Sequence, residues 1–168
     1  MSKATDISAS YVRNFIFGVE DSLVSTVGLL SGVAIADVGR STIVLTGIVL
    51  IFVEAISMGA GSFLSESSAR EFTAHAARPL RPSIAGGAIM FFSYFLAGFI
   101  PLFPYLLIDT ARAVFLSIGS SLASLCILGV VSARLSHTSA LQSSLRMLVV
   151  GGLAIAVGAV VGGLLTAG

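Results

Sequence analysis

The stretch that decides the fold is Phe15-Ile-Phe-Gly-Val-Glu-Asp-Ser-Leu-Val-Ser-Thr-Val-Gly-Leu-Leu-Ser-Gly-Val-Ala-Ile-Ala36. It is long enough to cross a membrane, because a transmembrane helix needs about 20 mainly apolar residues. Two adjacent acids, Glu20 and Asp21, interrupt it, and Glu54 interrupts the next apolar run in the same way. A charged side chain at the centre of a membrane helix costs roughly 2.5–3.5 kcal/mol, so intramembrane acids normally mark a path for ions or protons.

The composition places the whole chain in the membrane. Apolar residues make up 56% and charged residues 10%, with a mean hydropathy of +1.05, far from the values of soluble proteins. We predict an all-α integral membrane protein, a single domain over residues 1–168, because the connections are short and continuous apolar runs exclude the alternation of a β-barrel. The five predicted spans are 15–36, 42–64, 84–108, 113–132 and 147–167.

Basic residues predict the orientation, since they favour cytoplasmic loops. With the N-terminus in the cytoplasm and the C-terminus outside, only Arg40 and Arg112 fall on the outer side. The inner segments then hold Lys3, Arg13, Arg70, Arg78, Arg81, Arg134 and Arg146. We expect no cleaved signal peptide, because the first apolar run is too long and carries acids. The net charge of +1 gives no case for nucleic-acid binding.

Depth estimates predict that the acids meet Met58. Asp21 lies eight residues past Arg13, or roughly 12 Å along the helix, and Met58 lies eight residues before Glu66. On antiparallel neighbours these two residues are level, with Glu54 one turn deeper on the face of Met58. Glu20 is open to two readings, an ion pair with Arg13 or part of an ion path. For Asp21 and Glu54 we favour neutralisation by a bound cation or a proton.

The remaining polar and reactive side chains carry weaker signals. Glu71 and His75 are four residues apart and could share a helical face at the cytoplasmic entrance, although a solvated extension of the helix is the favoured interpretation. His137 is read as a solvated loop residue and Cys126, the single cysteine, as a packing residue. No nucleophile and base pairing indicates an enzyme.

Small residues predict close helix packing. Gly28 and Gly32 form a G-x-x-x-G pair, as do Gly158 and Gly162, while Gly61 and Ser65 are similarly spaced. Whether these faces pack within one subunit or between subunits is left open. Pro101 and Pro104, near the outer end of the third span, favour a kink over a gate.

Several motifs resemble the vacuolar iron transporter family over nearly the whole chain. Tyr11-Val-Arg-Asn-Phe-Ile-Phe-Gly-Val-Glu-Asp-Ser-Leu-Val-Ser-Thr-Val-Gly-Leu-Leu-Ser-Gly-Val-Ala34 is similar to the family's first helix, and Glu54-Ala-Ile-Ser-Met-Gly-Ala-Gly-Ser-Phe-Leu-Ser65 to its second. Ile100-Pro-Leu-Phe-Pro-Tyr105 and Leu145-Arg-Met-Leu-Val-Val-Gly-Gly152 resemble segments of its third and last helices. The first two motifs together are the specific ones.

The resemblance implies a homodimeric transporter in the lipid bilayer that exports Fe²⁺ or Mn²⁺ from the cytoplasm in exchange for protons. Its path would run near the dimer axis, lined by the first two helices. By position, Asp21 and Met58 match the family's metal-binding aspartate and methionine, so the predicted metal residues are Asp21, Met58, Glu54 and Glu20. No resident cofactor is expected, because the metal is cargo and the proton is the counter-ion.

This chain departs from the family pattern in three places. Leu50 stands where an acid is expected, with Glu54 supplying a carboxylate one turn later, and Asn14 stands where the resemblance predicts an aspartate. Residues 66–82 are too few to build the family's glutamate-rich cytoplasmic domain. The alternative function is therefore a non-transporting scaffold or assembly partner with vestigial acids. The minimal chain favours the plasma membrane of a prokaryote.

Overall fold

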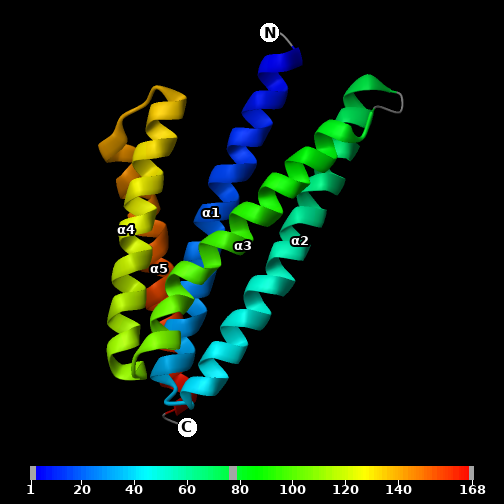
Figure 1. The fold of residues 1–168 in the computed structure, drawn as a ribbon. Helices are drawn as coiled ribbons and strands as arrows, with labels where there is room; N and C mark the ends of the chain where they lie inside the picture. The colour runs from blue at the N-terminus through cyan, green and yellow to red at the C-terminus, as the bar shows by residue number, and fades with distance from the viewer. Residues whose placement is uncertain (1–2, 76–78, 167–168) are drawn as a thin grey trace.

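The computed structural model describes residues 3–75 and 79–166, and over these ranges it contains five α-helices (Figure 1). They are α1 (Lys3–Ile35), α2 (Arg40–Ala74), α3 (Arg81–Leu107), α4 (Thr110–Ser136) and α5 (Ala140–Thr166). Each contains a segment long and apolar enough to cross a membrane. The prediction of five transmembrane helices is confirmed, while the side of the membrane that each end faces stays a prediction. Arg78 and Ala167, which the sequence analysis used, lie outside the described residues.

The helices are longer than the apolar spans. The largest difference is at α2, which continues past Leu64 to Ala74, because a helix satisfies its own backbone hydrogen bonds whether its side chains are apolar or polar. It ends at His75, whose φ of 50° is left-handed, and His137 ends α4 in the same conformation with φ 53°. A left-handed residue is a common helix terminator. Both histidines therefore stand at exposed helix ends.

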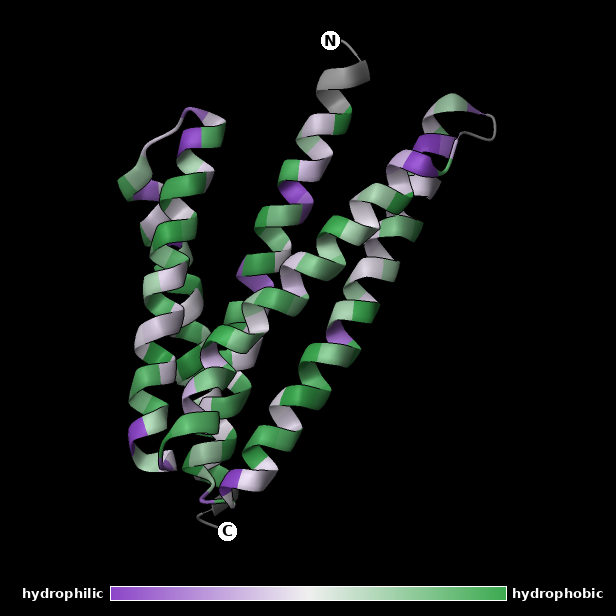
Figure 2. Ribbon diagram, viewed as in Figure 1, coloured by the Kyte–Doolittle hydropathy of each residue, from purple (hydrophilic) through white to green (hydrophobic). Residues whose placement is uncertain are grey.

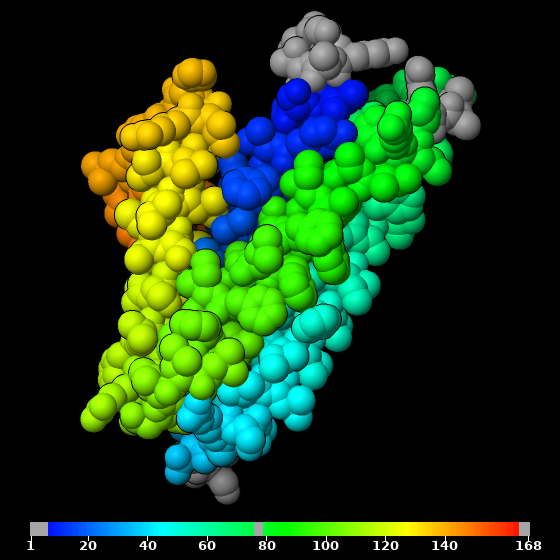
Figure 3. Space-filling view, in the orientation of Figure 1, coloured from blue at the N-terminus to red at the C-terminus, as the bar shows by residue number. Residues whose placement is uncertain are grey.

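Helix α3 forms the centre of one half of the molecule. It packs extensively against both α1 and α2, whereas α1 and α2 contact each other much less. In Figure 1 these two helices converge at the end where α1 leads into α2 and separate toward the N-terminal end, with α3 crossing them. Helices α4 and α5 pack on each other and on α1. The space-filling view shows the N-terminal part of α1 between α4 and α3 (Figure 3).

Glycines allow α3 to approach its neighbours at backbone distance. A Cβ built at Gly87 would lie 2.7 Å from the carbonyl oxygen of Gly59, and one at Gly59 would lie 2.9 Å from Cβ of Phe91. On the other side, a Cβ at Gly18 would lie 2.9 Å from Cβ of Ser93. Small residues at such crossings give close van der Waals packing, which holds membrane helices together where the hydrophobic effect does not.

The two G-x-x-x-G pairs pack on each other within one chain. A Cβ at Gly158 or Gly162 would overlap the backbone of Gly28 or Gly32, respectively. These faces therefore join α1 to α5 inside the subunit, which answers the question that the sequence left open. Gly61 is different, since a Cβ there meets nothing within 4 Å.

Polar capping closes the end of the bundle opposite the N-terminus. The guanidinium of Arg40 donates to the carbonyl oxygens of Tyr105 at 2.6 Å and Leu106 at 2.5 Å. These are carbonyls of the last turn of α3, which lack helical partners and carry the negative end of the helix dipole. Arg40 thus ties the start of α2 to the end of α3, which continues through Pro101 and Pro104 without interruption.

Apolar side chains fill the contacts beside these caps. One cluster of buried residues joins α1, α2, α3 and α4 and includes Leu30, Ile51 and Leu102, while another includes Leu23, Leu125 and Met147. Cys126 is partly buried on α4, and its carbonyl oxygen accepts a hydrogen bond from Ser144. Coloured by hydropathy, the helices are hydrophilic mainly at their ends, with isolated hydrophilic turns midway along α1 and α2 (Figure 2).

Replacing Gly158 with alanine will destabilise the bundle. The added methyl overlaps the carbonyl oxygen of Gly28, so α1 and α5 must separate, and overpacking of this kind typically costs about 1–3 kcal/mol. The matched control is Gly152→Ala on the same helix, where a Cβ meets nothing within 4 Å. Unfolding in mixed detergent micelles measures both variants, and equal stabilities would contradict the α1–α5 contact.

Candidate metal site between α1 and α2

Two carboxylates from neighbouring helices lie near each other inside the bundle. Asp21 on α1 and Glu54 on α2 are both half-buried, and they are close enough for their charges to interact. Both also act electrostatically on the phenol of Tyr94, a fully buried residue of α3. Three helices therefore contribute to one polar region at the middle of the spans.

The contacts of Gly98 establish which turns of α1 and α2 are level. A Cβ on this α3 glycine would lie 2.9 Å from the Ser22 hydroxyl oxygen and 2.7 Å from a side-chain carbon of Ile51. Asp21 precedes Ser22, and Glu54 lies three residues past Ile51, so these two acids share a level. Met58 lies about 6 Å further along α2, one turn toward the N-terminal end. The level of Met58 relative to Asp21 stays a prediction.

Glu20 stands beside this pair and has no cationic partner among the described residues. Its charge interacts with that of Asp21, and its side chain is half-buried. Arg13 is exposed, and the ion pairs found among the described residues join Arg70 to Glu66 and Arg112 to Asp109. The Arg13–Glu20 pair, one of the two interpretations of Glu20, is not formed.

A hydroxyl pair from α1 and α3 lines the same region. The Ser25 hydroxyl and the Tyr94 phenol share a hydrogen bond of 2.7 Å, and the Ser22 hydroxyl donates to the Tyr94 carbonyl oxygen at 2.6 Å. These bonds orient the α1 turn that carries Asp21. Sequence reasoning missed Tyr94, because an aromatic residue in an apolar span carries no signal until its neighbours across the helix interface are known.

The predicted entrance residues do not join this region. Glu71 is exposed near the end of α2, and His75, also exposed, packs its ring 6.4 Å from that of Phe72. Over residues 7–75 and 79–164, whose side chains the structure describes, no three His, Cys, Asp or Glu side chains form a group able to hold a metal ion by themselves. A cation at Asp21 and Glu54 would therefore need further ligands, from Met58, from water or from a second subunit.

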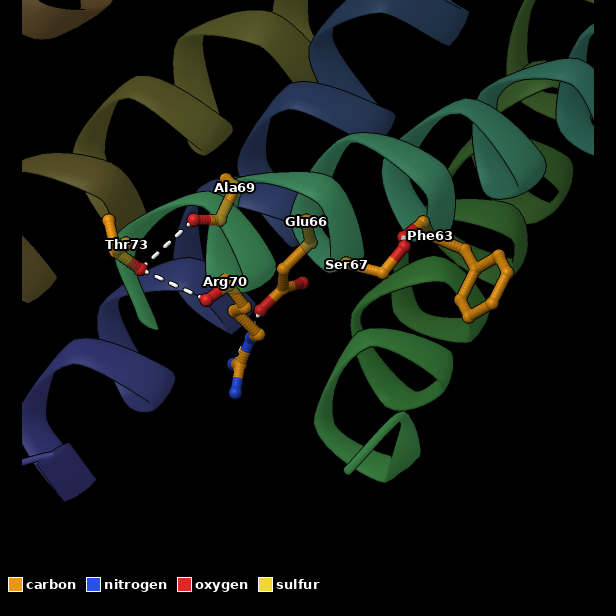
Figure 4. A network of polar contacts seen from close by, with 6 residues as sticks. All are labelled: Phe63, Glu66, Ser67, Ala69, Arg70 and Thr73. Atoms are coloured by element: carbon orange, nitrogen blue, oxygen red, sulfur yellow. Dashed lines mark hydrogen bonds and ion pairs between the residues drawn. The ribbon is translucent and has the colours of Figure 1, made fainter. Parts of the chain in front are cut away.

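The structure adds an acid that the sequence analysis used only as a marker of depth. Only 8% of the surface of Glu66 is exposed. Its Oε1 forms an ion pair with the guanidinium of Arg70 at 2.7 Å. Figure 4 shows both side chains on the same side of α2. A signal was present, because Glu66 continues the buried face of α2 at helical spacing. That face comprises Ile43, Gly47, Ile51, Ala55, Gly59 and Glu66.

Comparison with known proteins matches the chain to a family model described as the VIT family, over residues 12–85 and 76–163. This chain belongs to the VIT family. The first matched segment contains Asp21, Glu54 and Met58, and the second contains most of α3 to α5. The resemblance stated from the motifs is thereby confirmed.

A curated relative agrees with this assignment. A segment of 68 residues is 31% identical to a protein of Toxoplasma gondii named vacuolar iron transporter. The segment is 40% of this VIT-family chain and 22% of that relative's length. The chain thus spans only a minor part of the relative that it matches.

The Ser25–Tyr94 hydrogen bond will contribute to stability as a pair. Tyr94→Phe and Ser25→Ala should each destabilise the protein by about 1 kcal/mol, the usual worth of such a bond. Because either change removes the same bond, the double variant should cost clearly less than the sum. Unfolding in detergent measures the four members of this cycle, and full additivity would contradict the bond.

Proposed function

We propose that this VIT-family protein is a transporter that carries Fe²⁺ or Mn²⁺ out of the cytoplasm in exchange for protons. The observation that carries the proposal is the proximity of Asp21 and Glu54, two half-buried acids without a cationic partner among the described residues. Charges at this depth are costly unless neutralised. A transported cation and a returning proton would neutralise them in turn. The vacuolar iron transporter relative supports iron as cargo.

The ligand chemistry supports a transition metal. Carboxylate oxygens bind divalent cations in general, whereas a thioether favours softer metals over Ca²⁺ and Mg²⁺. Met58 lies one helical turn from Glu54 on the same face of α2. An ion moving along this face would pass from the thioether to the two carboxylates. Because metal binding displaces protons from its ligands, the same acids can couple the two flows.

A homodimer would complete the path. Along α2, the residues beside Glu54 expose large apolar side chains, among them Phe52, Val53 and Ile56. Lipid tails cannot solvate a half-buried carboxylate, so a second copy of the chain against this face would separate Glu54 from lipid. The path would then lie between α1 and α2 near the dimer axis, with α3 as its inner wall. We place the protein in a prokaryotic plasma membrane.

Asp21→Asn will abolish transport in this proposal. Liposomes containing the wild-type protein should take up Fe²⁺ or Mn²⁺ when a pH gradient is imposed. The uptake rate of the variant should be lower by more than about tenfold, because even changes to residues that only support metal ligands lower metal affinity or activity 10–100-fold. Asp37→Asn is the control, since Asp37 is exposed in the α1–α2 turn. Full uptake by Asp21→Asn, or no gradient-dependent uptake by the wild type, would favour the non-transporting scaffold.

Met58→Leu will change selectivity more than rate. Leucine keeps the volume and removes the sulfur, so preference for Fe²⁺ and Mn²⁺ over Ca²⁺ and Mg²⁺ should fall while uptake persists. Competition of each cation against Mn²⁺ uptake in the same liposomes measures this preference. An unchanged competition series would remove Met58 from the path.

A further inference from the structure

A second polar region lies at the N-terminal end of the bundle, where α1, α2 and α3 meet at Gly86. A Cβ built on this glycine would overlap Oε2 of Glu66 and lie 2.9 Å from Nδ2 of Asn14. The side chains of Asn14 and Glu66 therefore converge over the bare backbone of α3. Asn14 is 2% exposed and Glu66 8% exposed, so both are more than nine-tenths buried.

The polar atoms at this junction lack protein partners. Oε2 of Glu66 and Nδ2 of Asn14 are buried without a hydrogen bond, as are the hydroxyl oxygens of Ser10 and Ser83. Ser10 lies one turn before Asn14 on α1, and Ser83 lies one turn before Gly86 on α3. Buried polar groups are almost always satisfied by protein, water or an ion. Glu66 Oε2 and Asn14 Nδ2 meet over Gly86, and Ser10 and Ser83 lie one turn away on the same helices, so an ion or a water molecule at this junction could satisfy these atoms.

The donor set suits a divalent cation. Arg70 holds Oε1 of Glu66 and leaves Oε2 directed to the junction. A half-turn of the Asn14 amide exchanges Nδ2 for Oδ1, because the two orientations have the same shape. Carboxylate, amide and hydroxyl oxygens are the ligands that hard divalent cations prefer. A hydrogen bond from Asn14 to Glu66 would satisfy only those two residues and would leave Ser10 and Ser83 unpaired.

The positive charge of Arg70 weakens cation binding at this junction. The junction also lies between the N-terminal end of the bundle and Asp21, where an ion would pass. The guanidinium is 2.7 Å from Oε1, so it lowers the attraction of the carboxylate for a cation. Weak binding is what conduction requires, since an ion must leave as well as enter. Asn14 lies seven residues before Asp21, on nearly the same face of α1 and about 10 Å away along the helix.

We propose that Asn14 and Glu66, above Gly86 and beside Ser10 and Ser83, form a second divalent-cation site through which ions reach Asp21 and Glu54. The proposal rests on the proposed function for the statement that this ion is cargo, but the binding itself does not depend on transport. No thioether contributes, so this site admits Mn²⁺, Ca²⁺ and Mg²⁺ alike, and discrimination falls to the turn of α2 that carries Met58.

Binding of Mn²⁺ tests the site. It is measured on the purified full chain in detergent by equilibrium dialysis with metal analysis. The wild type should bind one Mn²⁺ more per chain than Glu66→Gln, and excess Ca²⁺ should displace that ion first. Asp21→Asn should lose a different ion, one that resists Ca²⁺. Asp109→Asn, which neutralises an exposed acid at the other end of the bundle, should bind as the wild type does.

Gly86→Ala tests the same site without removing a ligand. Its methyl occupies the space between Glu66 and Asn14, so the Ca²⁺-sensitive Mn²⁺ should be lost, whereas Gly61→Ala adds a methyl in open space and should keep it. Asn14→Asp should tighten binding at least tenfold by adding a carboxylate. Thermal unfolding of the apo proteins checks that each variant is folded.

The outcomes separate the two proposals. If Glu66→Gln and Gly86→Ala are folded and bind as much Mn²⁺ as the wild type, the junction only holds the helices together, and the proposal of a second site is overturned. If Asp21→Asn keeps all its Mn²⁺ while Glu66→Gln loses an ion, the junction stands and the metal site at Asp21 fails. Unchanged binding by Asn14→Asp also contradicts the junction.

Discussion

The structure depends on two close helix crossings, in which α3 packs on α1 and on α2. Glycines at the crossings bring the backbones together, with Gly87 of α3 against Gly59 of α2 and Gly18 of α1 against Ser93 of α3. Because α3 takes up the contacts of both helices, α1 and α2 separate toward the N-terminal end without losing packing. Asp21 and Glu54 lie on these two helices and are half-buried.

The buried acids of the bundle have two different environments. Glu66 is almost fully buried, and its Oε1 is paired with the guanidinium of Arg70, so its negative charge is partly neutralised. Asp21 and Glu54 have no cation beside them among the described residues and lie close enough to repel each other. Two like charges in a region of low dielectric favour the uptake of a cation or a proton. This contrast is why the middle of the spans is the stronger candidate for the transport site and the N-terminal end the weaker one.

Sequence reasoning succeeded where the signal was local. Apolar length located all five spans, and the unusual cost of an intramembrane acid singled out Asp21 and Glu54. The level of Met58 relative to Asp21 stays a prediction. Sequence reasoning missed Tyr94, and it passed over the burial of Glu66, since both roles depend on contacts with other helices.

The sequence by itself thus determined the membrane class, the number of spans, the family and the identity of the central acids. Hydropathy and helical period are properties of a single segment, so they can be read before folding. Only the tertiary structure decided which helices touch, that the paired glycines join α1 to α5 within one chain, and that Asn14 meets Glu66 over Gly86. The rotation and crossing of each helix follow from the close fit of small residues on several helices at once, and no single segment contains that information.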